Sequence, residues 1–130
     1  MKVAVVGLGA MGMGIAKSSL RAGLDTVGFD VSEDKRSIFS KAGGEVAIKS
    51  EQAAVDSDCL AIVVVNQEQT EAVLFVENCA SNVLPMGDVV IGCATVTPDY
   101  ARDVSSRLNS MGLLYLDAPI SGGIIKATDG

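Results

Sequence analysis

The chain has 130 residues, of which 48% are hydrophobic and 20% charged, and its formal net charge at pH 7 is −6. These values exclude a disordered chain and favour one globular domain, and an acidic balance without a basic cluster argues against nucleic acid or an anionic membrane as a partner. No apolar run reaches the roughly 18 residues that span a bilayer, and the first strand begins at Lys2 with no room for a signal peptide, so we expect a cytoplasmic protein.

In the first half of the chain, short apolar runs alternate with helical patterns. Ser32 is a candidate N-cap, and two acidic residues follow it where the helix dipole favours negative charge. Ser50 could cap a second, shorter helix in the same way. The predicted strands are Lys2–Val6, Asp25–Asp30 and Glu45–Ile48, and the predicted helices are Ala10–Ala22, Ser32 to about Ala42, and Ser50–Val55.

The second half opens on "CLAIVVV", residues 59–65. Seven apolar residues without alternation indicate a strand that is buried on both faces, as in a parallel sheet. Thr97 and Pro98 then supply the N-cap and the first position of a helix, which Gly112 ends. The other predicted elements are a helix at Gln67–Val76 with Val73 and Val76 facing inward, and strands at Asp88–Gly92 and Leu113–Asp117.

This alternation of strands and helices predicts an α/β fold. We expect a Rossmann-type, doubly wound parallel sheet of about six strands, covered by helices on both faces. No linker, repeat or low-complexity stretch interrupts the pattern, so residues 1–130 should form one domain.

Between the first predicted strand and the first predicted helix lies "GLGAMG", whose glycines have the GxGxxG spacing. Gly7 permits a tight turn, Gly9 lets a pyrophosphate approach the backbone, and Gly12 lets the helix pack close to the strand. The helix N-terminus adds free N–H groups and a positive dipole end, so an acidic protein can hold an anion here. The sequence therefore predicts a dinucleotide-binding loop formed by Gly7, Leu8, Gly9, Ala10, Met11 and Gly12.

Asp30 ends the second predicted strand about 20 residues past the loop, where dinucleotide sites place a carboxylate against the adenosine ribose hydroxyls. A carboxylate accepts hydrogen bonds from both hydroxyls but repels a 2′-phosphate. The basic residues Lys35 and Arg36 follow only one helical turn later. We therefore expect NAD as the cofactor, with NADP less favoured. The alternative is a glycine-rich turn followed by a surface acid.

Ligands of doubly wound sheets bind at the carboxyl ends of the strands, near the switch in strand order. Three segments reach that edge after predicted strands: Val65 with Asn66, residues 93–95, and residues 117–123. We expect Val65, Asn66 and Thr95 to contact the cofactor. Asn66 could equally cap the helix that follows it, and Thr95 could be a plain turn residue.

Three cysteines and the absence of histidine limit the chemistry that the chain can perform. Cys59, Cys79 and Cys93 are widely spaced and form no CxxC pair, which argues against a disulfide framework and a zinc site. We expect them to be small buried hydrophobic side chains and expect no metal site. Without histidine, no Ser–His or Cys–His nucleophile pair can form from this chain.

Two stretches, "VAVVGLGAMGMGIA" near the start and "LDAPISGG" near the end, carry a family resemblance. They resemble the β-hydroxyacid dehydrogenases, the family of 3-hydroxyisobutyrate dehydrogenase, tartronate semialdehyde reductase and 6-phosphogluconate dehydrogenase. The stretches "VVNQEQTEAVLF" and "CATVTPDYARDVSSRL" are most similar to the L-threonate dehydrogenase branch. The resemblance implies oxidation of a 3-hydroxy acid by hydride transfer to NAD.

The resemblance also implies roles for the residues near the end of the chain. Ser121, Gly122 and Gly123 would bind the substrate beside the nicotinamide, with a plain turn as the alternative, and Asp117 would fix the loop. The family's general acid/base is a lysine in a G-x-x-x-K-x-x-N context on a second, all-helical C-terminal domain, which this chain lacks. Lys126 lies where the family has no catalytic lysine. We therefore expect no catalytic residue here, little or no turnover by this chain alone, and homo-oligomers only together with that domain.

Two positions depart from the family pattern. Many members have Asp-x-Ser-Thr where this chain has Gly92-Cys93-Ala94-Thr95, and many have a proline at the position of Asn66. The competing interpretations are a stand-alone dinucleotide-binding module and a truncated chain without chemistry. An imine or 6-phosphogluconate reductase is less favoured, because of the "DAPISGG" match and Asp30.

Overall fold

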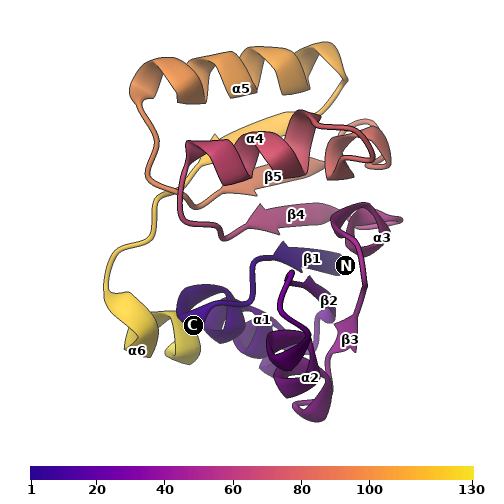
Figure 1. The fold of residues 1–130 in the computed structure, drawn as a ribbon, viewed down its shortest axis with the longest axis vertical. Helices are drawn as coiled ribbons and strands as arrows, with labels where there is room; N and C mark the ends of the chain where they lie inside the picture. Colours follow the sequence, from indigo (N-terminus) through magenta and orange to yellow (C-terminus); the bar gives the residue numbers. More distant parts are fainter.

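Six parallel strands form one sheet in the order β3-β2-β1-β4-β5-β6 (Figure 1). The computed structural model describes all residues from 1 to 130. The order reverses between β1 and β4, which is the switch point of a doubly wound sheet, so the predicted Rossmann-type α/β fold is confirmed. The strands are β1 (Lys2–Val6), β2 (Asp25–Phe29), β3 (Glu45–Val46), β4 (Cys59–Ile62), β5 (Val89–Gly92) and β6 (Leu114–Asp117).

Helices connect the parallel strands, as βαβ units require. None of them is long and apolar enough to cross a membrane. The helices are α1 (Ala10–Arg21), α2 (Glu33–Lys41), α3 (Ser50–Ala54), α4 (Gln67–Phe75), α5 (Pro98–Ser110) and α6 (Gly123–Asp129), with one 3₁₀ turn, η1 (Ala80–Asn82).

Alternate residues of β1 divide the core into two layers, as the two-residue period of a strand requires. One layer holds α1 and α2 against the sheet, and its buried members are Val3, Val5, Leu8, Ala16, Phe39 and Ala61. The other layer holds α3, α4 and α5, and it includes Ala4, Val6, Ala53, Leu60, Leu74, Val90, Val104 and Leu108. The glycine loop after β1 is therefore anchored between two packed layers.

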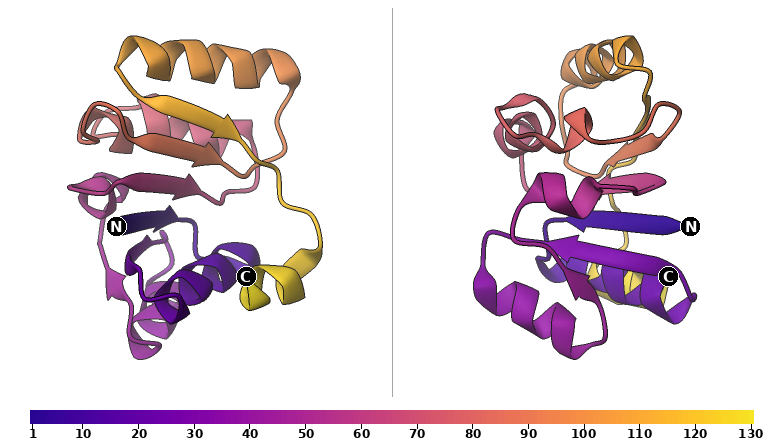
Figure 2. Two further views of the ribbon diagram at one scale, coloured as in Figure 1. Left: turned by 180° about the vertical axis from the view of Figure 1, so that it is seen from behind. Right: turned by 90° about the vertical axis from the view of Figure 1, so that its right-hand side faces the viewer.

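One side of β5 and β6 has no helix packed over it. Leu114 and Leu116 of the edge strand β6 are 56% and 53% exposed, and their partners Val89 and Ile91 on β5 are half-buried. Figure 2 (left) shows β5 and β6 from this uncovered side. Helices lie on both faces of the sheet, as expected, but they leave this side of β5 and β6 bare, because α4 and α5 both pack on the opposite face.

Several element boundaries differ from the predicted ones. The strand predicted at 59–65 ends at Ile62, and the following residues turn toward the carboxyl edge. Ser50 is the first residue of α3 rather than its cap. The N-cap residue is Lys49, whose side chain makes no capping hydrogen bond. α4 ends at Phe75, so Val76 is 52% exposed and Leu74 is the buried residue instead.

Two elements were not predicted, η1 and α6. The caps at Ser32 and Thr97 are confirmed, since each side chain accepts a hydrogen bond from the N–H three residues later. Of the cysteines, only Cys79 is buried, whereas Cys59 and Cys93 are half-buried and all three are free thiols. The expectation of buried cysteines is therefore correct for one of the three.

Candidate functional site

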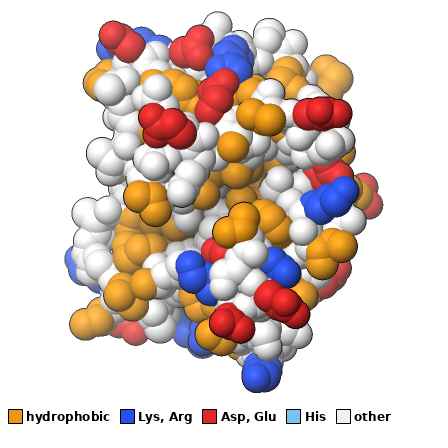
Figure 3. Space-filling model, viewed as in Figure 1, with side chains coloured by type: hydrophobic (Ala, Val, Ile, Leu, Met, Phe, Trp, Pro, Cys, Tyr) orange, Lys and Arg blue, Asp and Glu red, His pale blue; other side chains and the backbone are white.

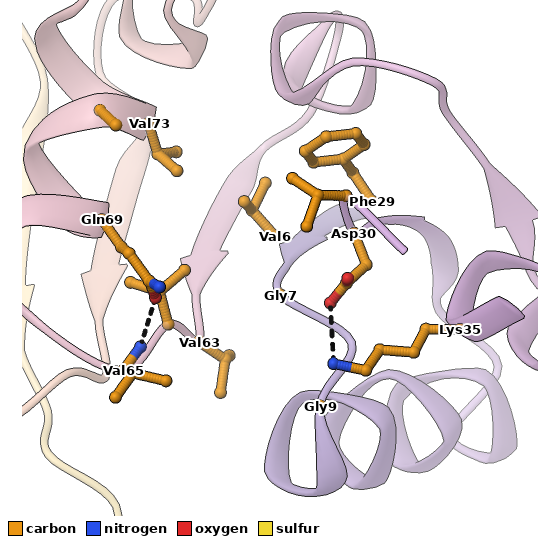
Figure 4. A pocket seen from close by; sticks show the side chains of 13 residues that line it. Val6, Gly7, Gly9, Phe29, Asp30, Lys35, Val63, Val65, Gln69 and Val73 are labelled. Atoms are coloured by element: carbon orange, nitrogen blue, oxygen red, sulfur yellow. Dashed lines mark hydrogen bonds and ion pairs between the residues drawn. The ribbon is translucent and has the colours of Figure 1, made fainter. Parts of the chain in front are cut away.

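A pocket of ≈ 320 Å³ lies at the carboxyl edge of the sheet, between the ends of β1 and β2 on one side and the β4–α4 corner on the other (Figure 4). Its walls are mostly apolar. In Figure 3, hydrophobic side chains gather in the middle of this face, between the charged side chains of its upper and lower parts. The pocket thus occupies the switch point, where this type of sheet binds ligands.

The glycine loop closes one side of the pocket, and its three glycines have different surroundings. Gly7 has a φ of 98°, and a β-carbon there would overlap the carbonyl oxygen of Val63. A β-carbon on Gly12 would overlap the carbonyl oxygen of Gly7, so α1 packs directly onto the loop. Around Gly9, by contrast, nothing lies within 4 Å of the β-carbon position. The loop therefore leaves open space beside Gly9, where a ligand can approach the backbone.

The N-terminus of α1 carries no cap of its own. Gly9 at the N-cap has no side chain, and no acidic residue lies in the first turn. The helices α2, α4 and α5 are each capped by a side chain, from Ser32, Asn66 and Thr97, and each has an acid in its first turn. Because the first N–H groups of a helix need acceptors, α1 is the long helix whose positive end is free for an anion.

Asp30 is 8% exposed and is tied to the loop by backbone hydrogen bonds. The N–H of Leu8 donates to its Oδ2 at 2.8 Å, and the N–H of Ser32 donates to its Oδ1 at 2.9 Å. Each carboxylate oxygen keeps lone pairs for a further donor. The carboxylate is therefore held at the pocket wall and can still accept hydroxyl hydrogen bonds.

Two cations lie closer to Asp30 than the sequence spacing indicated. The Nζ of Lys35 is 3.9 Å from Asp30 Oδ2 and lines the pocket (Figure 4). Arg36 is turned to the backbone, where its Nη1 donates to the carbonyl oxygens of Asp30 and Val31 at 2.6 and 3.2 Å. The negative charge of Asp30 is partly offset at this end of the pocket.

The opposite wall is a hydrogen-bonded corner between β4 and α4. The N–H of Val65 donates to Gln69 Oε1 at 2.9 Å, and the N–H of Gln69 donates to Asn66 Oδ1 at 2.9 Å. Asn66 is therefore the cap of α4, which was one of its two predicted roles. Val65 is 80% exposed and lines the pocket across from Val31, which is 88% exposed.

The structure brings four predicted cofactor residues to the pocket wall and leaves others outside it. Gly7, Gly9, Asp30 and Val65 line the pocket, whereas Asn66 and Thr95 do not. Leu8, Ala10, Met11 and Gly12 belong to the loop and to the first turn of α1. Lining residues that sequence reasoning did not assign to the site are Val6, Phe29, Val31, Lys35, Val63, Val64, Gln69, Ala72 and Val73. Only Lys35, a cation just past the predicted ribose acid, carried a usable signal.

The segment after β6 runs along the carboxyl edge of the sheet to α6, which lies beside α1 (Figure 1). Ser121, Gly122 and Gly123 are exposed in this segment. α6 packs on α1 so tightly that a β-carbon on Gly14 would lie 2.9 Å from the carbonyl carbon of Ala127. The loop is thus held at the same edge as the pocket without being part of its lining.

A thiol and a phenol near this edge have raised pKa values. Burial, together with Cys59, raises the pKa of the Cys93 thiol to about 11. Burial also raises the pKa of Tyr115, as do the nearby groups of Asp117 and Cys93. Lys126 lines a separate groove between α1 and α6. Neither the Cys93 thiol nor the Tyr115 phenol is therefore poised as a general base at neutral pH.

The family model described as the NAD binding domain of 6-phosphogluconate dehydrogenase matches residues 2–130. The chain belongs to this family. The NAD-binding domain is 42% identical to the L-threonate dehydrogenase of Cupriavidus necator, over 98% of this chain and 43% of that protein. It superposes on the 3-hydroxyisobutyrate dehydrogenase of Salmonella typhimurium with a TM-score of 0.93 and 36% identity, over 98% of this chain and 45% of that one.

A more distant similarity shows only the fold of the NAD-binding domain. An imine reductase of Myxococcus stipitatus, solved with NADP⁺, superposes with a TM-score of 0.89 at 22% identity and covers 96% of this chain and 43% of that one. The NAD-binding domain spans less than half the length of the curated relatives it matches.

Proposed function

We propose that this chain is the NAD-binding half of an oxidoreductase that oxidises a 3-hydroxy acid of the 3-hydroxyisobutyrate or L-threonate type. The observation that carries the proposal is the open space at Gly9 beside the uncapped N-terminus of α1, at the switch point of the sheet. The substrate class is supported by the names of the L-threonate and 3-hydroxyisobutyrate dehydrogenases to which the chain is similar.

The residues present fit a dinucleotide. The N–H groups of the 7–12 loop would hold the pyrophosphate, and Asp30 would accept hydrogen bonds from the adenosine ribose. The exposed side chains of Val31 and Val65 would contact the adenine, and Asn66 and Thr95 would lie toward the nicotinamide end. When bound there, NAD would supply the acceptor for a hydride from the carbinol carbon of the substrate.

NAD is proposed as the preferred cofactor, because Asp30 is buried, fixed and directed at the pocket wall. A 2′-phosphate would bring two negative charges to this carboxylate. Lys35 reduces that repulsion, since its ammonium lies 3.9 Å from Asp30 Oδ2. We therefore expect the chain to bind NAD more tightly than NADP, by a margin that Lys35 reduces.

The loop Ser121–Gly123 would bind a carboxylate or hydroxyl of the substrate through its serine hydroxyl and its backbone N–H groups. The proton of the substrate hydroxyl needs a base. Of the lysines near this edge, Lys35 pairs with Asp30, and Lys126 lies against Gly122 and lines the groove between α1 and α6. We therefore propose that the base belongs to a helical domain outside these 130 residues and that the chain alone has little or no turnover. A stand-alone dinucleotide-binding module is the second candidate.

Calorimetric titration of the purified chain with NAD⁺ and NADP⁺ tests the cofactor proposal. Saturable binding of NAD⁺, weaker for NADP⁺, is the expected result. Asp30→Asn should narrow the difference between the two affinities, whereas Glu33→Gln, which removes a charge from the exposed first turn of α2, should leave it unchanged. A folded chain that binds neither nucleotide would overturn the proposal.

An assay with NAD⁺ and a panel of 3-hydroxy acids tests the proposal that the chain is inactive alone. We expect no NADH from the chain and NADH formation when the remaining part of a related dehydrogenase is supplied in trans. Turnover by the chain alone would contradict the missing-base proposal. NAD⁺ binding with no activity in either mixture would favour the stand-alone module.

A further inference from the structure

The helix α4 forms one wall of the pocket, yet its backbone has few close neighbours. It contributes Gln69, Ala72 and Val73 to the lining. Its main-chain neighbour is η1, while the sheet and α5 approach its backbone at few points. Thr70 and Leu74 are its only buried residues. The placement of this wall therefore depends on side-chain contacts rather than on close backbone packing.

One such contact is a partly exposed polar cluster that joins α4 to α5. Arg107 of α5 donates two hydrogen bonds to the carboxylate of Glu71, from Nη2 to Oε1 at 2.7 Å and from Nη1 to Oε2 at 3.0 Å. The hydroxyl of Tyr100 donates to Glu71 Oε2 at 2.7 Å. The Cζ of Arg107 also lies 3.5 Å from the ring centroid of Phe75. Arg107 thus contacts two successive turns of α4, at Glu71 and at Phe75.

The charges of the cluster are stable over the working pH range. The hydrogen bond from Arg107 lowers the pKa of Glu71, and the bond from Tyr100 acts in the same direction. Burial and the bond to Glu71 raise the pKa of Tyr100, so the tyrosine stays a donor. Asp103 also pairs with Arg107, at 3.2 Å. These shifts favour the charged pair of Glu71 and Arg107 at neutral pH.

We propose that the cluster of Glu71, Arg107 and Tyr100 is a positioning device that sets the affinity of the pocket for the adenosine half of a dinucleotide. None of the three side chains lines the pocket. Their effect passes through α4, because Gln69 and Val73 lie two residues on either side of Glu71. Gln69 also accepts the hydrogen bond from Val65, so the β4–α4 corner moves with the helix. The inference rests on the proposed nucleotide site.

The test is a double-mutant cycle with Glu71→Gln, Arg107→Met and the double variant. The dissociation constants of NAD⁺ and AMP are measured at a temperature at which circular dichroism shows every variant folded. Each single variant should raise both dissociation constants about fivefold. The double variant should raise them no further, because the two residues act as one unit. Arg107→Lys keeps the charge but loses the paired hydrogen bonds of the guanidinium, and it should bind more tightly than Arg107→Met.

The matched control is Glu68→Gln, which removes the same charge from an exposed position of the same helix and should leave both constants unchanged. If the variants melt at lower temperature but bind as wild type does, the cluster only stabilises the fold and the inference is wrong. A wild-type chain that is folded but binds no nucleotide would instead overturn the proposed function, and this inference with it.

Discussion

The two walls of the pocket are built by different means. On the β1–β2 side, backbone meets backbone: Gly12 packs onto the carbonyl of Gly7, and the N–H groups of Leu8 and Ser32 hold Asp30. On the β4–α4 side, side chains make the connections, through Gln69 and the Glu71–Arg107 pair. At Gly7 and Gly12 the first wall has no room for a β-carbon, whereas the second wall tolerates change at its contacts.

This difference matches what each wall would hold. A pyrophosphate needs N–H groups at fixed positions, and a backbone that is packed on both sides supplies them without reorganisation. An adenine ring is bound mainly through apolar contact, which a helix on adjustable side chains can provide. Substitutions on the backbone-built wall should therefore have large effects on stability or binding. Smaller effects are expected in the half of the sheet that carries the other wall, strands β4, β5 and β6, which is called the β4–β6 side below.

Gly12→Ala should have the largest effect on stability. The added β-carbon would overlap the carbonyl oxygen of Gly7, which is backbone and cannot move without displacing the loop. Strain of this kind exceeds the gain in helix propensity, so we expect the free energy of unfolding to fall by about 3 kcal/mol. Urea denaturation followed by circular dichroism measures it. A loss below about 1 kcal/mol would mean that α1 can shift away from the loop.

Gly9→Ala should separate binding from stability. Gly9 has an extended backbone with a φ of −65°, and its β-carbon would point into open space, so the free energy of unfolding should change by less than about 1 kcal/mol. The same methyl group would occupy the space proposed for the pyrophosphate, and NAD⁺ affinity should fall at least tenfold, or about 1.4 kcal/mol. Calorimetry on both glycine variants checks this. Unchanged affinity would move the phosphate site away from Gly9.

Sequence reasoning located the backbone-built wall well, because its signals are local. The GxGxxG spacing places Gly7, Gly9 and Gly12 in one turn, and each of them has surroundings that agree with the predicted reason for a glycine. The buried strand at "CLAIVVV" and the caps at Ser32 and Thr97 are likewise short-range patterns. The alternation of strands and helices predicted the doubly wound parallel sheet, whereas the order of its strands was not predicted.

The other wall depends on contacts between distant segments, which composition and spacing do not encode. Glu71 and Arg107 lie on different helices, and only the packed structure shows that they meet. The proximity of Lys35 to Asp30 depends on how the chain turns from β2 into α2. The bare side of β6 likewise results from the packing of α4 and α5 on the other face of the sheet. The alternation within "LYLD" does not indicate it.

Asp88→Asn should stabilise the β4–β6 side at neutral pH. Asp88 Oδ2 is buried without a hydrogen-bond partner, and loss of hydration together with Asp58 raises the pKa of this carboxyl above its ordinary value of 3.8. An amide removes the charge, and we expect a gain of about 1 kcal/mol at pH 7.

The sign of the pH dependence checks the cause of that gain. Because the pKa of Asp88 is raised in the folded state, wild type is free of the penalty below pH 3.8 and acquires it as the pH rises through the folded pKa. The difference between Asp88→Asn and wild type should therefore be full at pH 7 and vanish below pH 4. Asp99→Asn, an exposed acid of α5, is the control. A constant difference across this range would point to packing rather than charge.

Leu116→Lys should have the smallest effect, and it tests whether the uncovered side of β6 stays uncovered in solution. Leu116 is 53% exposed on an edge strand, where a lysine is well tolerated and opposes edge-to-edge pairing. The free energy of unfolding should change by less than about 0.5 kcal/mol, independently of protein concentration. Denaturation at two concentrations tenfold apart measures both quantities. A loss above 1 kcal/mol that grows with concentration would show that another copy of the chain covers this face, and the smaller sensitivity assigned to the β4–β6 side would then hold only for the dilute monomer.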